Sequence, residues 1–362
     1  SDVRANTSTA VPVDGGGPGG EYRLTGHKWF TSAPMSDAFL VLAQAPAGLS
    51  CFLVPRILPD STRNALQLMR LKDKLGNRSN ASAELEYTDA AGWLVGEEGS
   101  GVRVIIKMVN ATRLDVTNWS VSLMRQAVSQ AAWHSTQRSA FGDRLIDKPL
   151  MQNVLADLEL ETEVGTMMIM RVAGAFERAA SDEHEAAFLR LASAVAKYWL
   201  SKRSTPVVRE ALECIGGDGY VEESVLPRLY REAPLNAIWE GTGNVIALDV
   251  LRALQRSPIS GEAFLAELDH AAGADASFDR ARKEVAARIA SVRATDLPDE
   301  AAARRLVEQL ATSWAAALCL RHEPELANAY IQSRLDRNWG SEFGTLDASL
   351  DLAHIARREI PK

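Results

Sequence analysis

The pattern of apolar residues changes at Gly99-Ser100-Gly101, and this change constrains the fold more than any other feature of the chain. No Gly or Pro occurs from residue 102 to residue 138, and the apolar residues there recur at helical spacing. This stretch predicts one long helix. Before the change, short apolar or alternating runs are separated by Gly, Pro and Asp, which is typical of strands. We therefore expect an α+β protein in which a β-rich part precedes a helical part.

The β-rich part is expected to occupy residues 1–98. Its strand-like runs lie at 21–25, 28–31, 38–43, 49–55 and 82–87. A glycine-rich stretch at 14–20 lies between strands, and no helix follows it. This stretch therefore predicts a flexible hairpin connection rather than a loop that cradles a phosphate.

The helical part is expected to divide into a bundle, residues 99–257, and an extra C-terminal helical domain, residues 258–362. After the first helix, the bundle predicts helices from 149 to about 180, from 183 to 204, from 206 to 216 and from 244 to 255. Asp182 is the predicted N-cap of the second of these, and Pro206 is predicted to open a separate helix. Long helices joined by short turns indicate an antiparallel bundle of the four-helix type. The alanine-rich extension predicts helical stretches at 261–272, 278–293, 299–321, 323–338 and 345–358.

The charge balance limits the classes of partner. The net charge is −7 and the sequence pI is near 5.5. Beyond residue 257 the chain has 17 Asp or Glu and 13 Lys or Arg. This balance disfavours strong binding to DNA or to an anionic membrane, because both need a cationic face. A local cationic group keeps DNA contact open as an alternative, and it consists of Arg280, Arg282, Lys283 and Arg288.

Other sequence signals are mostly absent. No apolar run approaches the roughly 20 residues needed to cross a bilayer and no secretory signal opens the chain, so a cytoplasmic protein is expected. Cys51, Cys214 and Cys319 are far apart and odd in number, which argues against a disulfide framework or a zinc cluster. The histidines show no metal-ligand spacing, and no metal site is predicted. Ser1 begins what reads like the middle of a folded segment, so the beginning is expected to have been removed or left out.

Residues 238–244 carry the most informative chemistry. Glu240 lies between the bulky Ile238 and Trp239 and a flexible turn that contains Gly241 and Gly243. Poor hydration disfavours the carboxylate anion, which suits a general base, and the glycines let the backbone approach a flat ligand closely. Thr242 and Asn244 supply polar groups. Taken alone, the same residues are also compatible with a helix-entry turn that holds an incidental glutamate.

Five segments, in this order, resemble motifs of the acyl-CoA dehydrogenase family. They are residues 1–3, 26–32, 138–142, 215–220 and 238–244, and the similarity covers residues 1 to about 256. The resemblance implies a barrel-like β domain followed by the bundle, with FAD held between the two domains. It also implies that the substrate is an acyl-CoA or a related thioester.

The resemblance assigns cofactor contacts to particular residues. Trp29 would cover one side of the isoalloxazine, and Thr31 or Ser32 would hydrogen-bond near N5. In the family, the arginine that matches Arg138 reaches FAD bound mainly by a neighbouring subunit, which implies a homo-oligomer, expected to be a tetramer. The other positions that the resemblance assigns to the cofactor are Ser1, Phe141, Gly216, Gly217, Trp239, Thr242 and Asn244.

Each of these residue types also has a simpler explanation. From the sequence pattern alone, a core aromatic residue in a sheet is the preferred interpretation of Trp29. Arg138 is compatible with an arginine that interacts with the end of a helix, and Gly216-Gly217 with an ordinary helix-ending pair.

The same resemblance assigns catalysis to Glu240. A carboxylate in the family removes the proton α to the thioester carbonyl while the β-hydride passes to flavin N5. Some members carry this base immediately before an arginine of the first bundle helix, where this chain has Thr112 before Arg113. Threonine cannot serve as that base, which leaves Glu240 as the candidate. Nitroalkane-oxidising relatives have Asp at this position, so Glu240 argues against that activity.

Two departures argue against an ordinary dehydrogenase of this family, and the second points to one subgroup. Glu213 stands where many relatives have Gln, and the C-terminal extension is absent from ordinary dehydrogenases. The extension, with residues 71–80 and 226–231, resembles the AidB-like subgroup, the alkylation-response flavoproteins. This resemblance implies weak dehydrogenase activity, or alternatively a DNA-associated flavoprotein that protects against or repairs alkylation damage. Arg252, three turns along the helix, is a candidate to pair with Glu240 and hold it ionised but unreactive.

Overall fold

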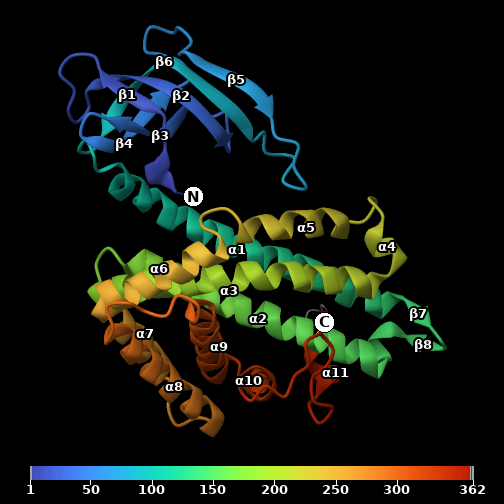
Figure 1. The fold of residues 1–362 in the computed structure, drawn as a ribbon. Helices are drawn as coiled ribbons and strands as arrows, with labels where there is room; N and C mark the ends of the chain where they lie inside the picture. The colour runs from blue at the N-terminus through green and yellow to red at the C-terminus, as the bar shows by residue number, and fades with distance from the viewer. Residues whose placement is uncertain (1, 359, 361–362) are drawn as a thin grey trace. The chain divides into compact units, whose positions relative to one another are not determined.

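The computed structural model describes residues 2–358 and 360, apart from the side chain of Lys107. Its contacts divide the chain into two units, residues 1–112 and 113–362. The first contains a closed β-sheet and the second is helical, which confirms the expected α+β class (Figure 1). The finer boundaries at 98/99 and 257/258 stay predictions.

Six strands of the described residues form one sheet in the first unit. They follow the order β2-β1-β3-β4-β6-β5, and a further pairing of β2 with β6 closes five of them into a barrel. The strands are β1 (Thr9–Pro12), β2 (Glu21–Thr31), β3 (Ala38–Ala45), β4 (Gly48–Pro55), β5 (Leu66–Leu71) and β6 (Ala83–Val95).

Strand β2 shows how the barrel closes. The predicted runs 21–25 and 28–31 are one strand, and its register with β6 shifts between Leu24 and Gly26. Gly26 has φ +150°, and a Cβ there would lie 2.5 Å from the Ser8 hydroxyl. A bulge of this kind bends a strand and increases its twist, which lets a sheet curve into a barrel. The predicted hairpin at 14–20 is confirmed, because Pro12 of β1 pairs with Tyr22 of β2.

Strands β1 and β5 were not predicted, and both have weak local patterns. β1 is only four residues long, with a proline at its end. β5 is exposed along most of its length, and its apolar residues do not alternate regularly with polar ones. Its pairing with β6, rather than its own sequence, makes it a strand.

The long helices match their predictions at most ends. Helix α1 spans Gly101–Gln137, α2 Pro149–Arg178, α3 Glu183–Ile215 and α6 Gly243–Arg256. The predicted cap of α3 is confirmed, because the Asp182 carboxylate accepts from the amides of His184 and Glu185. Between α3 and α6 lie three short helices, α4 (Gly217–Tyr220), α5 (Leu226–Glu232) and the 3-10 helix η3 (Ala233–Ala237).

The prediction that Pro206 opens a separate helix is wrong. Pro206 lies inside α3, which continues to Ile215. A proline inside a helix costs about 3 kcal/mol, whereas each fully buried aliphatic side chain contributes about 1.5–3 kcal/mol. Val207 and Val208, which follow Pro206 directly, are fully buried, so packing outweighs the lost backbone bond.

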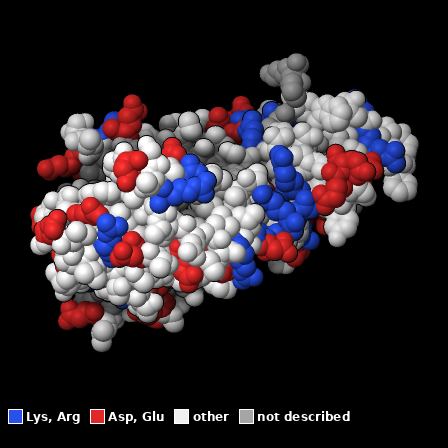
Figure 2. Space-filling model, turned by 90° about the horizontal axis from the view of Figure 1, so that it is seen from above, with Lys and Arg blue, Asp and Glu red and all other residues white. Residues whose placement is uncertain are grey.

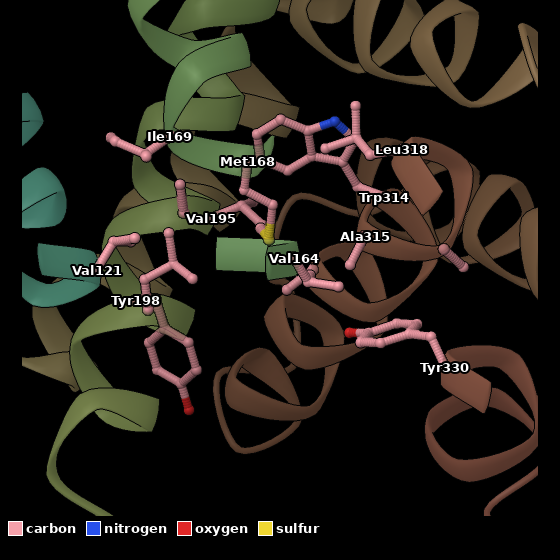
Figure 3. Close-up of a cluster of buried hydrophobic side chains, with 14 of the residues drawn as sticks. Val121, Val164, Met168, Ile169, Val195, Tyr198, Trp314, Ala315, Leu318 and Tyr330 are labelled. Carbon is pink, nitrogen blue, oxygen red and sulfur yellow. The ribbon is translucent and has the colours of Figure 1, made fainter. Parts of the chain in front are cut away.

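The C-terminal extension packs into the same hydrophobic core as the bundle. Trp314 of the extension lies with Met168 of α2 and Val195 of α3 in one cluster (Figure 3). The extension contains α7 (Pro258–Asp269), α8 (Ala276–Arg293), α9 (Ala303–His322), α10 (Pro324–Tyr330), a π-helical turn (Ile331–Leu335) and α11 (Leu352–Ile355). The predicted helix at 345–358 is therefore reduced to one short turn of helix.

A buried ion-pair network, which consists of Asp157, Glu161, Arg203 and Arg334, also joins the extension to α2 and α3. Arg334 binds Asp157 and lies 2.9 Å from Glu161, while Arg203 lies 3.0 Å from the other oxygen of Glu161. Burial alone would raise the pKa of Glu161, but the two guanidinium groups outweigh it and hold that pKa below its usual range.

Within the described residues, no helix is long and apolar enough to cross a membrane.

Candidate active site

The candidate active site is built around the turn at residues 238–244, here named the Glu240 turn, which joins η3 to α6. Glu240 has φ +54° and Gly241 has φ +105°. A residue other than glycine in the left-handed region is uncommon, and such strained residues cluster at functional sites. A side chain at Gly241 is also disfavoured sterically, because a Cβ there would lie 2.9 Å from the terminal methyl of Ile246, which would have to shift.

Two cations from distant helices hold the backbone of the Glu240 turn. Arg113 of α1 donates from Nε to the Glu240 carbonyl oxygen at 3.3 Å. Lys197 of α3 donates from Nζ to the Gly241 carbonyl oxygen at 2.5 Å. Two consecutive carbonyls, on either side of the flexible Gly241, are therefore fixed by side chains that are remote in sequence.

Arg113 is itself fixed by α6. Its Nη1 lies 3.0 Å from an Asp249 carboxylate oxygen, and Arg190 of α3 lies 2.8 Å from the other oxygen. Burial alone would raise the pKa of Asp249, but Arg190 and Arg113 outweigh it and lower that pKa. Asp249 therefore stays ionised at neutral pH and ties both arginines to the helix that follows the turn.

Lys197 is a buried cation. The residue is 1% exposed. The pKa of Lys197 is lowered to about 8, mainly by burial and also by the positive charges of Arg113 and Lys202, while the negative charge of Glu240 opposes the decrease. Lys197 and Glu240 are therefore electrically coupled.

The Glu240 side chain contrasts with its backbone. It is half-buried, and its carboxylate makes no hydrogen bond or ion pair with any residue that the structure describes. Neighbouring Trp239 is fixed, because its indole N–H donates to Asn236 at 3.2 Å and its ring lies 5.5 Å from that of Trp119. The turn thus presents an unpaired carboxylate on a restrained backbone, which is the arrangement a general base needs.

Sequence reasoning missed Lys197 and gave Arg113 no role of its own. Their contacts to the turn span 44 and 127 residues, and no local pattern encodes such distances. One signal was available for Lys197, since it follows the small, mostly apolar stretch 192–196 in a helix. A lysine in such a stretch is rarely buried without a partner.

The other polar residues predicted at the turn make fewer contacts with the rest of the described chain. Thr242 precedes α6, and its hydroxyl makes no capping hydrogen bond among the described residues. Asn244 is exposed, which leaves its amide accessible. Arg252 is exposed on α6 and has no ion pair with a described residue, so the guanidinium that reaches the turn is that of Arg113.

Gly216 and Gly217 end α3 at an open surface. Gly216 has φ +75°, and a Cβ at either position would meet no described atom within 4 Å. Glu213, the departure before this pair, lies 3.6 Å from Arg209, so its charge is partly balanced. The backbone here is accessible to a ligand, as predicted contacts to a cofactor require.

Arg138 and Phe141 lie at a small hairpin formed by β7 (Ser139–Ala140) and β8 (Asp143–Arg144). Phe141 is 98% exposed and has φ +52°. Arg138 is exposed and forms no ion pair with a described residue. Both side chains are therefore available to a ligand or to a second copy of the chain.

In the first unit, Trp29 lies near the end of β2 with Thr31 and Ser32. Its ring is 56% exposed, so the core-aromatic explanation does not apply. The Lys72 ammonium lies 3.2 Å from the ring centroid and is also bound to Glu84 at 2.6 Å. Thr31 is half-buried and Ser32 exposed. Ser1, also predicted to contact the cofactor, lies outside the described residues.

Comparison with family models identifies the class. Residues 1–90 match the acyl-CoA dehydrogenase middle domain, and residues 99–255 match the acyl-CoA dehydrogenase C-terminal domain. The chain therefore belongs to the acyl-CoA dehydrogenase family, as the sequence motifs predicted.

Individual proteins of the family show how similar this chain is to known members. The chain is 47% identical to the AidB protein of Escherichia coli strain K12 over 345 residues, which is 94% of the chain and 61% of AidB. It is 39% identical to acyl-CoA dehydrogenase family member 11 of Caenorhabditis elegans over 70% of the chain and 42% of that protein. The crystal structure of C. elegans ACDH-11 in complex with C11-CoA has a TM-score of 0.81 at 29% identity and covers 99% of the chain and 61% of that protein. The chain thus spans about 61% of the length of AidB.

Proposed function

We propose that the protein is an FAD-dependent oxidoreductase of the acyl-CoA dehydrogenase type, in which Glu240 is the general base. One observation carries this proposal: the carboxylate of Glu240 is unpaired among the described residues, while its backbone is held by Arg113 and Lys197. Membership of the family supports FAD as the cofactor and an acyl thioester as the substrate.

The chemistry proposed for Glu240 is the removal of one proton. Its carboxylate accepts the proton α to the thioester carbonyl, and the electrons of that C–H bond form the Cα–Cβ double bond as the β-hydride leaves. FAD, when bound, supplies the hydride acceptor at N5. The restrained turn keeps the carboxylate at a fixed place, which lowers the entropic cost of reaching the transition state.

The described residues fit FAD in each unit taken by itself. In the first unit, Trp29 offers an exposed flat ring with the hydroxyls of Thr31 and Ser32 close by in sequence. In the second, the open space beside Gly216 and Gly217 would admit a ligand to the backbone. These residues are the proposed FAD contacts, together with Arg138, Phe141, Trp239, Thr242 and Asn244.

We also propose a homo-oligomer, with a tetramer as the expected form. Phe141 is almost fully exposed at φ +52°, and an aromatic ring held outward on a strained hairpin is suited to insertion into another copy. Arg138 beside it carries a planar fork that suits a pyrophosphate.

The test of the function is anaerobic titration of the natural full-length protein with a series of acyl-CoA thioesters, followed by flavin absorbance. Wild-type protein should be reduced by at least one member of the series. Glu240→Gln should keep its flavin and slow the reduction by at least about 100-fold, because the base is lost. The matched control is Glu284→Gln, which changes an exposed glutamate of α8 and should leave the rate unchanged. Equal rates in Glu240→Gln and wild type would remove Glu240 as the base.

The second candidate function is that of a DNA-associated flavoprotein, which the resemblance of the extension to the alkylation-response flavoproteins implies. The charge arrangement opposes it. Arg280 is paired with Asp336 at 2.6 Å, and Arg282 is paired with Asp269. Figure 2 shows basic and acidic side chains mixed on the visible face rather than a broad cationic field. Fluorescence anisotropy with duplex DNA at two salt concentrations separates the two functions, and salt-sensitive binding near physiological ionic strength would favour the second.

A further inference from the structure

The proposed function uses Lys197 as one support of the Glu240 turn, but it does not explain why that support is a buried charge. Lys197 is 1% exposed, and its hydrogen-bond partner among the described residues is the Gly241 carbonyl oxygen. A buried ammonium is costly, and an apolar residue would suit this position in the core of α3 better. A lysine held at such a position needs a reason outside folding.

We propose that Lys197 is a positioning residue for Glu240: its ammonium fixes the Gly241 carbonyl, so that the turn keeps the one conformation that presents the Glu240 carboxylate. The inference rests on the proposed function, because it assigns Lys197 a part in the work of the same carboxylate.

The geometry supports this role through Gly241. This residue has φ +105°, a conformation that only glycine adopts readily, and glycine also has the greatest freedom to leave it. Arg113 fixes the carbonyl before Gly241, and Lys197 fixes the carbonyl of Gly241 itself. Together the two hydrogen bonds restrain both peptide groups that flank Gly241. Loss of the Lys197 bond frees one of them.

The charges around Lys197 determine its protonation state, and therefore the strength of its hydrogen bond to the Gly241 carbonyl oxygen. Arg113 from α1 and Lys202 from α3 disfavour the protonated form of Lys197, and Glu240 of the turn favours it. Asp249 of α6 and Arg190 of α3 act on the site through their ion pairs with Arg113. The pKa of Lys197 is about 8, so the side chain is an ammonium below that pH and a neutral amine, a weaker donor, above it. The hold on the turn should loosen as pH rises through about 8.

The test compares Lys197→Met with the matched surface change Lys283→Met in the full-length protein loaded with FAD. Lys197→Met should retain flavin but slow its reduction by acyl-CoA by about 10- to 100-fold, the usual cost of a misplaced catalytic group. Its Tm should be unchanged or higher, because a buried charge has been removed. Lys283 is exposed on α8, and its replacement should change neither quantity. A reduction rate within twofold of wild type, or a lower Tm that accounts for the lost rate, would overturn the proposal.

The pH profile gives a readout that a purely structural lysine would not move. The wild-type reduction rate should fall as pH rises through about 8, where Lys197 loses its proton, and Lys197→Met should lack this limb. A limb that persists in the variant would contradict the assignment.

Hydrogen exchange tests the positioning role of Lys197 independently of the proposed function. If no acyl-CoA reduces the wild-type protein, the proposed function fails, but the positioning role is still measurable at the amides of residues 238–244. Lys197→Met should speed their exchange and Lys283→Met should not. Unchanged exchange in Lys197→Met would refute the positioning role whatever the substrate.

Discussion

The Glu240 turn and the buried ion-pair network lie in the same helical unit, and both combine carboxylates with cations, but they use them in opposite ways. In the network, Arg334 and Arg203 bind the carboxylates of Asp157 and Glu161 directly. At the turn, the cations bind backbone carbonyls and leave the carboxylate unpaired.

The difference separates a structural carboxylate from a reactive one. A carboxylate enclosed by two guanidinium groups has a low pKa and little tendency to accept a proton. A carboxylate whose backbone alone is restrained keeps its lone pairs available. The same residue types therefore fasten the extension in one place and are proposed to present a base in the other.

The largest expected effect is the loss of the network. Arg334→Ala leaves Asp157 and Glu161, which are almost fully buried, with unbalanced charge, and breaking a buried pair typically costs about 3–5 kcal/mol. Urea unfolding should show this decrease in the free energy of unfolding. Arg280→Ala is the matched control, because its exposed pair with Asp336 should contribute at most about 1 kcal/mol. Equal losses in the two variants would show that the network is not what fastens the extension.

A smaller effect is expected at the turn. Gly241→Ala places a side chain at φ +105° and 2.9 Å from Ile246, so it should destabilise the protein by about 1–3 kcal/mol and slow flavin reduction. Gly273→Ala is the control: it has φ +81° but no described atom within 4 Å of its Cβ. It should cost about 1 kcal/mol and leave the reduction rate unchanged. If both variants reduce flavin at the wild-type rate, the geometry of the turn does not matter for the reaction.

The smallest effect is expected at Arg252. Because it is exposed and has no ion pair with a described residue, Arg252→Ala should change stability by less than about 0.5 kcal/mol and leave flavin reduction within twofold of wild type. Stopped-flow absorbance would measure the rate. A tenfold faster reduction would restore the interpretation that Arg252 pairs with Glu240 and holds it unreactive, and it would weaken the contrast between the turn and the network.

The parts of this structure that follow local rules could be predicted from the sequence. The Asp182 cap, the hairpin at 14–20 and the long α1 each depend on neighbouring residues, and each is confirmed. Pro206 was misjudged because the packing of α3 outweighs a local preference.

The candidate site was predicted in part for the same reason. The turn residues carry a recognisable local pattern, so Glu240 could be singled out. Lys197, Arg113 and Asp249 reach the turn only through the packing of α1, α3 and α6. Tertiary contacts of this range leave no periodic trace in one sequence, so the means by which the turn is held could be seen only in the structure.

The most direct test of the central claim is the rate of flavin reduction by α-deuterated and unlabelled acyl-CoA in wild type and Glu240→Gln, measured by anaerobic stopped flow in the full-length protein. Wild type should show a slower rate with the deuterated substrate, because Glu240 removes the α-proton in the reductive step, and Glu240→Gln should show almost no reduction with either substrate. Rapid reduction in Glu240→Gln with the same isotope dependence as wild type would contradict the claim, since another group would then be removing the proton.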